Sequence, residues 1–438
     1  MDIKKHLTYD NFLLIILALI IILPVFQHTS PSRYYNVIIA RFEVVFILLS
    51  APYLLLNRKK INFISPFWTA VFCLWCIAVY YSVIQAEHYG PAYLRGIVTI
   101  VNAIFAIAVT LYFHLWKGRS SWIMAIVPIG FFISGLAVIH FGVNLTDFNE
   151  HCWACTGSFP NYSSIRHLDY HVFGAIIFTF YFLIESKRHH LLVAGSFVLL
   201  TYNFSFLLWS GGRGAIIASL TSFFVILTYL SKGERARFIM ASLLSLSISY
   251  LLLVNLGLDE MTREMVDRSM AYQNYSDLLA GLYNDFLPTL NIISGDRIEC
   301  CWIPTLEALS HSYLFGLGPE SYIYIEPRLF GTQPHNSVLQ FLLEWGVVGT
   351  LLFLVILSGM FRRGTKYLKS ENSPSEKTRR VVLLSLIIGF GVFSLVDGIF
   401  YHGLSLMIFS ITVAAFSSTQ VDPENSSPKN QLSEDPLK

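Results

Sequence analysis

The stretch FLLIILALIIILPVF, residues 12–26, has no charged side chain, and similar stretches recur along the whole chain. Hydrophobic residues make up 54% of the 438 positions and charged residues only 13%. A typical soluble domain has roughly 25% charged residues. No soluble core of this size needs so much apolar surface, so the bilayer must be the solvent for most of the chain. The sequence therefore predicts an all-α polytopic membrane protein.

Lys4 and Lys5 precede this first stretch, as basic residues precede the apolar part of a secretory signal peptide. No small-x-small cleavage site follows it, because the next residues are His28-Thr29-Ser30-Pro31. We therefore interpret the stretch as an uncleaved first membrane span.

Apolar runs of the length that crosses a bilayer, roughly 17–25 residues, can be counted along the sequence. They lie at about 11–27, 36–56, 64–84, 94–115, 122–143, 168–184, 191–209, 213–230, 238–256, 337–360, 381–397 and 399–418. The sequence thus predicts about twelve transmembrane helices. The last two runs are short and could instead form a re-entrant pair.

Positive charge is concentrated in alternate connections between these runs. One side of the membrane would hold 21 of the 30 Lys and Arg residues, including every lysine. Because positively charged connections remain in the cytoplasm, we expect this side and both termini to be cytoplasmic. An even number of spans agrees with this topology. The net charge of only +2 gives no broad basic surface for nucleic acid.

The opposite face carries two loops, residues 144–167 and 257–335. The second is too long to be structureless in a compact protein. Within it, residues 303–315 have the pattern of a short helix after Pro304. The polar C-terminal tail is expected to be disordered. The chain then divides into residues 1–256 (helices one to nine with the loop 144–167), 257–335 (the large, partly helical periplasmic loop), 336–419 (helices ten to twelve) and 420–438 (the cytoplasmic tail).

Nine arginines, and no lysine, lie outside the cytoplasmic connections. They are Arg33, Arg41, Arg95, Arg166, Arg213, Arg263, Arg268, Arg297 and Arg328. Arginine near the centre of a bilayer costs roughly 2.5 kcal/mol or more, but its guanidinium stays charged and binds phosphate with two hydrogen bonds. The pattern is typical of a site for an anionic lipid diphosphate. Alternatively, single arginines could reach lipid headgroups or pair with acidic residues of the large loop.

Arg213 stands in the segment Ser210-Gly211-Gly212-Arg213-Gly214, between the seventh and eighth runs. The two glycines before it allow a tight turn and a close approach of a ligand to the backbone. Arg213 would then lie in the first turn of the eighth span, where the helix dipole favours an anion. The alternative is a plain tight turn with an interfacial arginine.

His335 follows Pro334 at the start of the tenth run, at the outer interface. Histidine can take a proton from a sugar hydroxyl near neutral pH. Glu344, nine residues later, would lie about 13 Å farther along the helix, inside the membrane, where it needs a partner. The alternatives are an interfacial cap for His335 and a structural acid, bonded to the backbone or to Arg41, for Glu344.

Further polar residues could join the substrate site. Arg166, His167 and the segment Asp169-Tyr170-His171 open the sixth run at the outer face. Asp397 and His402, between the last two runs, could face the same substrate site.

Two arginines in the first half of the chain have simpler explanations. Arg41 and Glu43, two residues apart, do not share a helix face, so each needs a partner on another helix. Arg95 opens the fourth run, and the alternative to a role in the substrate site is a simple interfacial anchor.

The cysteines fall into two groups. Cys73 and Cys76 lie within the third run and are interpreted as packing residues. The other four lie on the outer side, where an oxidising compartment favours disulfides between the two loops. They are Cys152, Cys155, Cys300 and Cys301. A four-cysteine zinc site has compatible residue types, whereas a redox CxxC lacks its usual soluble fold.

Three segments, all between residues 210 and 350, resemble the O-antigen ligase/polymerase superfamily in order and spacing. They are Ser-Gly-Gly-Arg-Gly at 210–214; Ser294-Gly295-Asp296-Arg297 with Trp302 and Phe315-Gly316-Leu317-Gly318-Pro319; and Pro334-His335-Asn336-Ser337 through Glu344-Trp345-Gly346. The resemblance covers roughly a third of the chain. The other spans are similar only in topology.

The resemblance implies a GT-C-like glycosyltransferase of the bacterial inner membrane, with an undecaprenyl-diphosphate-linked glycan as donor and no metal or other cofactor. It assigns Arg213 and Arg297 to the diphosphate. It assigns His335 the role of base or acceptor-positioning residue at the periplasmic face. Arg166, His167, Arg41 and Glu344 are the further candidates for substrate binding, and membrane lipids are expected partners.

The acceptor remains open among members of this superfamily. Ligation of O-antigen to lipid A–core is the first expectation, polymerisation of O-antigen or exopolysaccharide repeat units the second, and protein O-glycosylation the third. A lipid or polysaccharide transporter is the alternative from another class, and it would bind its substrate at the midplane, between interrupted helices.

Overall fold

The computed structural model describes residues 9–23, 32–60, 65–116, 120–142, 165–185, 190–210, 212–256, 301–324, 334–371 and 373–418. Every regular element within these ranges is helical. Nine of the helices described are long and apolar enough to cross a membrane, and three shorter apolar helices accompany them. The prediction of an all-helical, polytopic membrane protein is confirmed.

Nine α-helices are described between residues 9 and 256, and their limits follow the hydropathy of the sequence closely. They are α1 (Tyr9–Ile22), α2 (Ser32–Leu56), α3 (Pro66–Gln85), α4 (Tyr89–Leu115), α5 (Ser120–Gly142), α6 (Ile165–Glu185), α7 (His190–Ser210), α8 (Arg213–Tyr229) and α9 (Lys232–Asn255), with the short η3 (Arg58–Lys60) after α2. Each helix begins and ends within about six residues of the ends of an apolar run. In the bilayer core every backbone N–H and C=O must be hydrogen-bonded within the protein, so a helix extends along the whole run.

The C-terminal part described contains a small helical region and three more apolar helices. Its elements are α14 (Ile303–Leu309), η6 (Ser321–Tyr324), α15 (Ser337–Ser370), α16 (Pro374–Val396), η7 (Ile399–Tyr401) and α17 (Gly403–Ser417). The predicted helix over 303–315 ends earlier, at Leu309, where turns follow. α15 continues to Ser370, past the end of its apolar run, on a polar and basic last section.

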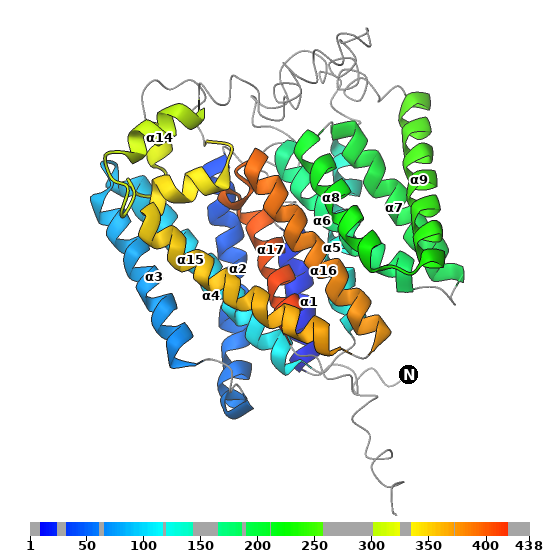
Figure 1. Cartoon of the computed structure of the whole chain (residues 1–438), viewed down its shortest axis with the longest axis horizontal. Helices are drawn as coiled ribbons and strands as arrows, with labels where there is room; N and C mark the ends of the chain where they lie inside the picture. The colour runs from blue at the N-terminus through cyan, green and yellow to red at the C-terminus, as the bar shows by residue number, and fades with distance from the viewer. Residues whose placement is uncertain are drawn as a thin grey trace, which may run out of the picture.

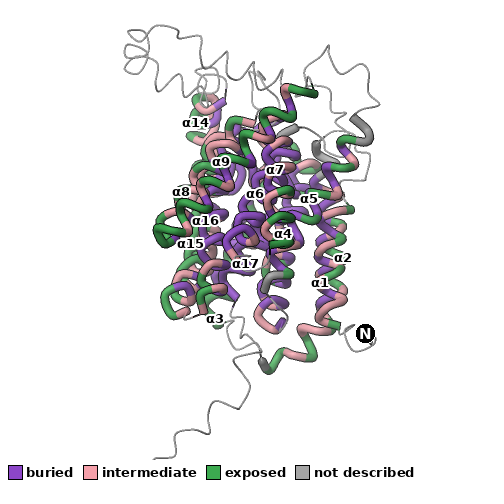
Figure 2. Tube along the Cα trace, turned by 90° about the vertical axis from the view of Figure 1, so that its right-hand side faces the viewer, coloured by how far each residue is buried: buried purple, intermediate pink, exposed green. Residues whose placement is uncertain are grey.

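The centre of the bundle is formed by α6, α16 and α17. α16 packs along α8, and α17 packs along α4 and between α15 and α16 (Figure 1). The tube view shows these central helices as mostly buried, while α3 and α9 carry many exposed residues (Figure 2). Apolar side chains on those outer faces suit a hydrocarbon solvent.

α15 is interrupted at Gly346, which has φ 64° and ψ −173°. Past the break, the backbone N–H groups of Val347 and Val348 donate to Tyr313 O (2.9 Å) and Leu314 O (3.0 Å). In return, the N–H of Leu317 donates to Leu343 O at 2.7 Å. The turn after α14 therefore supplies the hydrogen bonds that the helix loses, as irregular backbone at membrane depth requires.

Glycine is required on both sides of this junction. Gly316 and Gly346 both have positive φ, and a Cβ on either would collide with the backbone of the opposite segment. The Phe-Gly-Leu-Gly-Pro and Glu-Trp-Gly segments of the sequence are thus two halves of one packed junction. This junction anchors α14 and η6 to the first section of α15, which carries the site described next.

Candidate active site

The N-terminus of α15 is held by its cap residue. The side chain of Asn336 accepts hydrogen bonds from the N–H groups of Val338 (3.0 Å) and Leu339 (3.1 Å), and its Nδ2 donates to Leu395 O at 3.2 Å. Asparagine is a preferred cap because it satisfies donors that the first helical turn leaves open. The cap thereby ties the start of α15 to the end of α16.

His335 lies directly before this cap and is buried. It has φ +51°, a left-handed conformation that costs of order 1–3 kcal/mol outside glycine and must be held by its surroundings. Trp302 contributes by donating its indole N–H to Pro334 O at 3.0 Å. The backbone on both sides of the imidazole is therefore fixed.

Asp397, the cap residue at the end of α16, is the partner of this imidazole. Its Oδ1 lies 3.3 Å from His335 Nδ1 and accepts the N–H of Gly398 at 2.9 Å. Its Oδ2 accepts the hydroxyl of Tyr170, on α6, at 3.0 Å. A carboxylate at Nδ1 selects the tautomer with the proton on Nδ1, so Nε2 is the acceptor nitrogen. Three helices, α6, α15 and α16, meet at this pair.

Arg213 begins α8 at the same place in the fold, and its side chain is exposed. A Cβ on Gly212 would collide with the Asp169 carboxylate, next to Tyr170. A Cβ on Gly214 would meet Phe393 and Val396, next to Asp397. The glycines around Arg213 therefore bring its helical turn against the two helix ends that carry the partners of His335.

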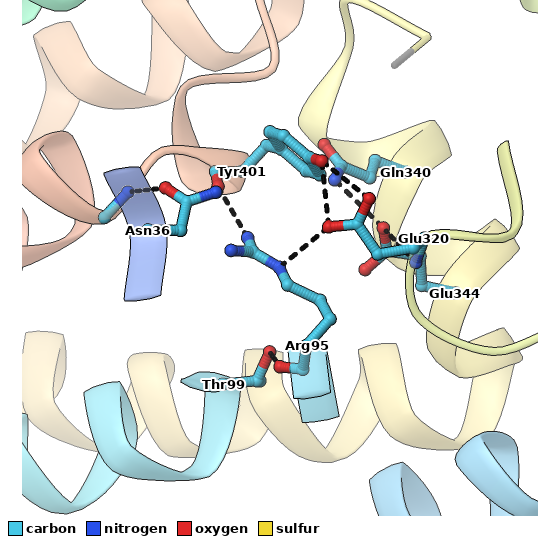
Figure 3. A network of polar contacts seen from close by, with 8 residues as sticks. Asn36, Arg95, Thr99, Glu320, Gln340, Glu344 and Tyr401 are labelled. Atoms are coloured by element: carbon cyan, nitrogen blue, oxygen red, sulfur yellow. Dashed lines mark hydrogen bonds and ion pairs between the residues drawn. The ribbon is translucent and has the colours of Figure 1, made fainter. Parts of the chain in front are cut away.

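A second cluster of polar side chains lies next to this pair and centres on Arg95 (Figure 3). Arg95, on α4, is buried; its Nη2 donates to Tyr401 O at 2.5 Å and its Nε lies 3.9 Å from Glu320 Oε1. The Tyr401 hydroxyl lies 2.8 Å from both Glu320 oxygens. The hydroxyl therefore donates to this carboxylate, which accepts it with its two oxygens.

Glu344 completes the second cluster. It is buried and accepts hydrogen bonds from Gln340 Nε2 at 3.1 Å and from the N–H of Glu320 at 3.4 Å (Figure 3). Its expected alternative partner, Arg41, is exposed on α2, while Arg95 is the basic residue whose charge acts on it. These contacts give Glu344 a structural role in holding η6 to α15.

The segment that connects α16 to α17, residues 397–402, joins the two clusters. Asp397 at its start contacts His335, and the carbonyl of Tyr401 near its end accepts a hydrogen bond from Arg95. Between them, the N–H of Phe400 donates to Ser337 Oγ at 3.4 Å. At the far side, the N–H of Gly403 donates to Asn36 Oδ1 at 2.7 Å. The position of Asp397 thus depends on contacts from α2, α4 and α15.

Several predicted site residues lie outside what the structure describes. Arg297, Cys152, Cys155 and Cys300 are outside the described residues, as are the side chains of Arg166 and His167. Cys301 is described, and its thiol is free and buried against Tyr322 and Leu343. The other three outer cysteines lie outside the described residues, so the disulfides stay a prediction. A buried apolar surrounding suits an unpaired thiol as well as a bridged one.

Sequence reasoning missed part of the site. A simple interfacial anchor was the alternative for Arg95, yet the side chain is buried and ion-paired with Glu320. Glu320 and Tyr401 were not singled out. Glu320 follows the Gly-Leu-Gly-Pro segment directly, which is the one signal that could have identified it. Among the described residues, no group of three or more His, Cys, Asp or Glu side chains is arranged to hold a metal ion.

The fold and this site define a class: a multi-span helical membrane protein with a buried histidine–carboxylate pair and an arginine at one end of the bundle. Residues 195–354 match the family model described as O-Antigen ligase. This match supports the resemblance to the O-antigen ligase superfamily found in the sequence. The matched region contains Arg213, His335 and Glu344. Comparison with curated proteins found no match.

Proposed function

We propose that this protein transfers a glycan from undecaprenyl diphosphate to an acceptor hydroxyl at the periplasmic face of the bacterial inner membrane. Ligation of O-antigen to lipid A–core is our first choice of reaction. The observation that carries the proposal is the His335–Asp397 pair at 3.3 Å, next to the helical turn that begins with Arg213. The family match to O-antigen ligases supports the same chemistry.

The proposed reaction assigns one step to each group. His335 Nε2 takes the proton of the acceptor hydroxyl, and Asp397 stabilises the imidazolium that forms. The hydroxyl oxygen forms a bond to the anomeric carbon from the face opposite the diphosphate, which inverts that centre. The carbon–oxygen bond to the diphosphate breaks, and the diphosphate leaves with its electron pair and its negative charge.

Arginine side chains would stabilise that leaving charge. Arg213 is exposed at the N-terminus of α8, where its own charge and the helix dipole both favour an anion. We assign Arg297 the same role, as the resemblance implies. Fixed guanidinium groups can stabilise a diphosphate without a metal ion, so we propose a metal-independent, inverting transferase.

Lipopolysaccharide profiles of cells that lack the gene test this proposal. Loss of a ligase should leave bare lipid A–core and an accumulated lipid-linked polymer. Loss of a polymerase should leave core that carries a single repeat unit. Complementation with the wild-type gene should restore the long chains, and complementation with His335→Ala should not. Full-length lipopolysaccharide in the His335→Ala strain would disprove the assignment.

One observation favours a transporter as the second candidate. α15 is interrupted at Gly346, and interrupted helices with buried charges are typical of transporter binding sites. Here, however, the open backbone groups at the break are bonded to Tyr313 and Leu314, and Glu344 is bonded to Gln340. The break is thus filled by the protein itself. A gene deletion that strands the glycan donor on the cytoplasmic side would support the transporter instead.

A further inference from the structure

A long apolar cavity lies between α3, α4, α15 and α17. Its volume is about 370 Å³, and aromatic and aliphatic side chains form most of its wall. At one end lie Arg95 and Gln340, and at the other lies Arg363. From Arg95 to Leu111, both in the wall, α4 rises about 24 Å, so the cavity is a narrow slot.

The slot borders the surrounding membrane. Trp68 of α3 and Ile107 of α4 both line it, and they are 36% and 37% exposed. Ala103 and Ala106 leave room between these larger side chains. A hydrocarbon chain could therefore enter from the bilayer without crossing a polar surface.

Basic side chains gather where the slot reaches the lysine-rich face. Arg363 lines the slot, and its Nε donates to Tyr367 at 3.0 Å, which aligns its guanidinium along α15. Arg362, Lys366 and Lys369 are exposed at a spacing that puts them on one face of the same helix.

We propose that the slot and this basic section of α15 bind one anionic glycerophospholipid from the leaflet at the lysine-rich face. One acyl chain occupies the slot, and the phosphate lies at Arg362, Arg363 and Lys366. Clusters of basic residues next to a membrane span attract anionic lipid headgroups, and an apolar slot that ends at such a cluster adds a place for the chain.

The dimensions limit how far this lipid reaches. An acyl chain spans about half of the roughly 30 Å hydrocarbon core. Measured along α15 from Arg363, that distance ends near Phe353, ten residues earlier, at about 15 Å. The chain therefore stops before the Arg95–Glu320 cluster, and the site is separate from the one proposed for glycan transfer.

Native mass spectrometry of the purified full-length protein, stripped of lipid, tests the proposal. Long-chain phosphatidylglycerol should bind at least tenfold more tightly than phosphatidylcholine with the same chains. Arg362→Gln/Lys366→Gln should weaken phosphatidylglycerol binding by about fivefold for each removed charge. Short-chain phosphatidylglycerol should bind the wild type weakly, because it leaves the slot unfilled. Ala106→Leu should also weaken binding of the long-chain lipid, because the larger side chain narrows the slot.

Matched variants on α9 control for general charge and bulk. Lys232→Gln/Arg235→Gln removes two exposed basic residues from the lysine-rich face of the protein, and Ala236→Leu enlarges an exposed alanine. Neither should change phosphatidylglycerol binding. Equal binding of phosphatidylcholine, or unchanged binding to Arg362→Gln/Lys366→Gln, would overturn the proposal. So would tight binding of the short-chain lipid, because the basic residues would then be only a charged surface.

Discussion

His335 combines a strained backbone with a tightly fixed side chain. Its φ of +51° is retained because Asn336 caps α15 immediately after it and Trp302 holds the carbonyl before it. Strain of this kind gathers at functional sites, where the surrounding structure compensates for it. The geometry presents Nε2 in one direction, with Nδ1 turned to Asp397.

Asp397→Asn should lower glycan transfer on the order of 10²-fold or more, because an amide no longer selects the correct tautomer or stabilises the imidazolium. The side chain keeps its size, so the fold should persist. Transfer by purified enzyme, measured with a saturating donor, checks this prediction. Unchanged turnover would show that Asp397 has only a structural role.

His335→Ala should lower transfer at least as much as Asp397→Asn does, because it removes the proposed base. His190→Ala is the matched control, since His190 is exposed at the start of α7, at the opposite end of that helix from Arg213. Its lipopolysaccharide profile should match the wild type. Equal loss of long chains in both variants would point to a failure of expression rather than of chemistry.

At this scale the sequence identified individual residues better than their partners. His335, Asp397 and Tyr170 were each named because they are polar residues at the ends of apolar runs. The sequence could not predict that these three side chains lie together, because their positions depend on how α6, α15 and α16 pack. Glu320 was missed for the same reason: it has positive φ and depends on Tyr401, 81 residues later, for its hydrogen bonds.

Among the helices, α15 is the one whose geometry most affects the site. Its first section follows His335 directly and carries Glu344, and the break at Gly346 separates that section from the long part that reaches the basic face. The first section can therefore be oriented by the turn after α14 rather than by the rest of the helix.

Gly346→Ala should destabilise the protein by about 3 kcal/mol, since the residue has positive φ and its Cβ would collide with Leu314. Gly391→Ala is the control: Gly391 lies within α16, and a Cβ there meets nothing within 4 Å. It should leave stability unchanged or raise it by up to about 1 kcal/mol. Thermal unfolding in detergent measures both. Similar melting temperatures for the two variants would contradict the described junction.

Helix limits were largely predictable, because hydropathy and helix length are both set by the thickness of the bilayer. α8 begins at Arg213 and α15 at Ser337, as the apolar runs indicated. The break at Gly346 was not predicted, since a single glycine in an apolar run is also compatible with a continuous helix. Of the last two runs, the first corresponds to α16, which is long enough to cross, whereas α17 is a shorter apolar helix.

Over the whole molecule, the Arg95–Glu320 ion pair links helices that are far apart in the sequence. Arg95→Met should cost about 3–5 kcal/mol, because it leaves a buried carboxylate without its cation. Arg95→Met/Glu320→Leu should cost less than Arg95→Met alone, since both charges are then gone. Melting temperatures of the single and double variants check this expectation, and strictly additive losses would show that the two side chains do not interact.

The proposed topology can be tested with cysteines introduced at the two ends of the bundle. Ser310, directly after α14, and Lys369, in the last turn of α15, are both exposed. α14 and the C-terminal end of α15 lie at opposite ends of the bundle (Figure 1). In spheroplasts, a membrane-impermeant maleimide should label Ser310→Cys, and it should label Lys369→Cys only after the membrane is opened. The parent chain gives the background from native cysteines. Labelling of Lys369→Cys in intact spheroplasts would reverse the orientation.

The junction at Gly346 also bears on how the chain is assembled during synthesis. Residues 313–318 leave the ribosome before the second section of α15, so the carbonyls of Tyr313 and Leu314 already exist when Val347 and Val348 need acceptors. This span reaches its final form only after an earlier stretch of chain has folded back on it. The insertion of α15 therefore depends on residues 313–318, whereas an uninterrupted span can enter the lipid alone.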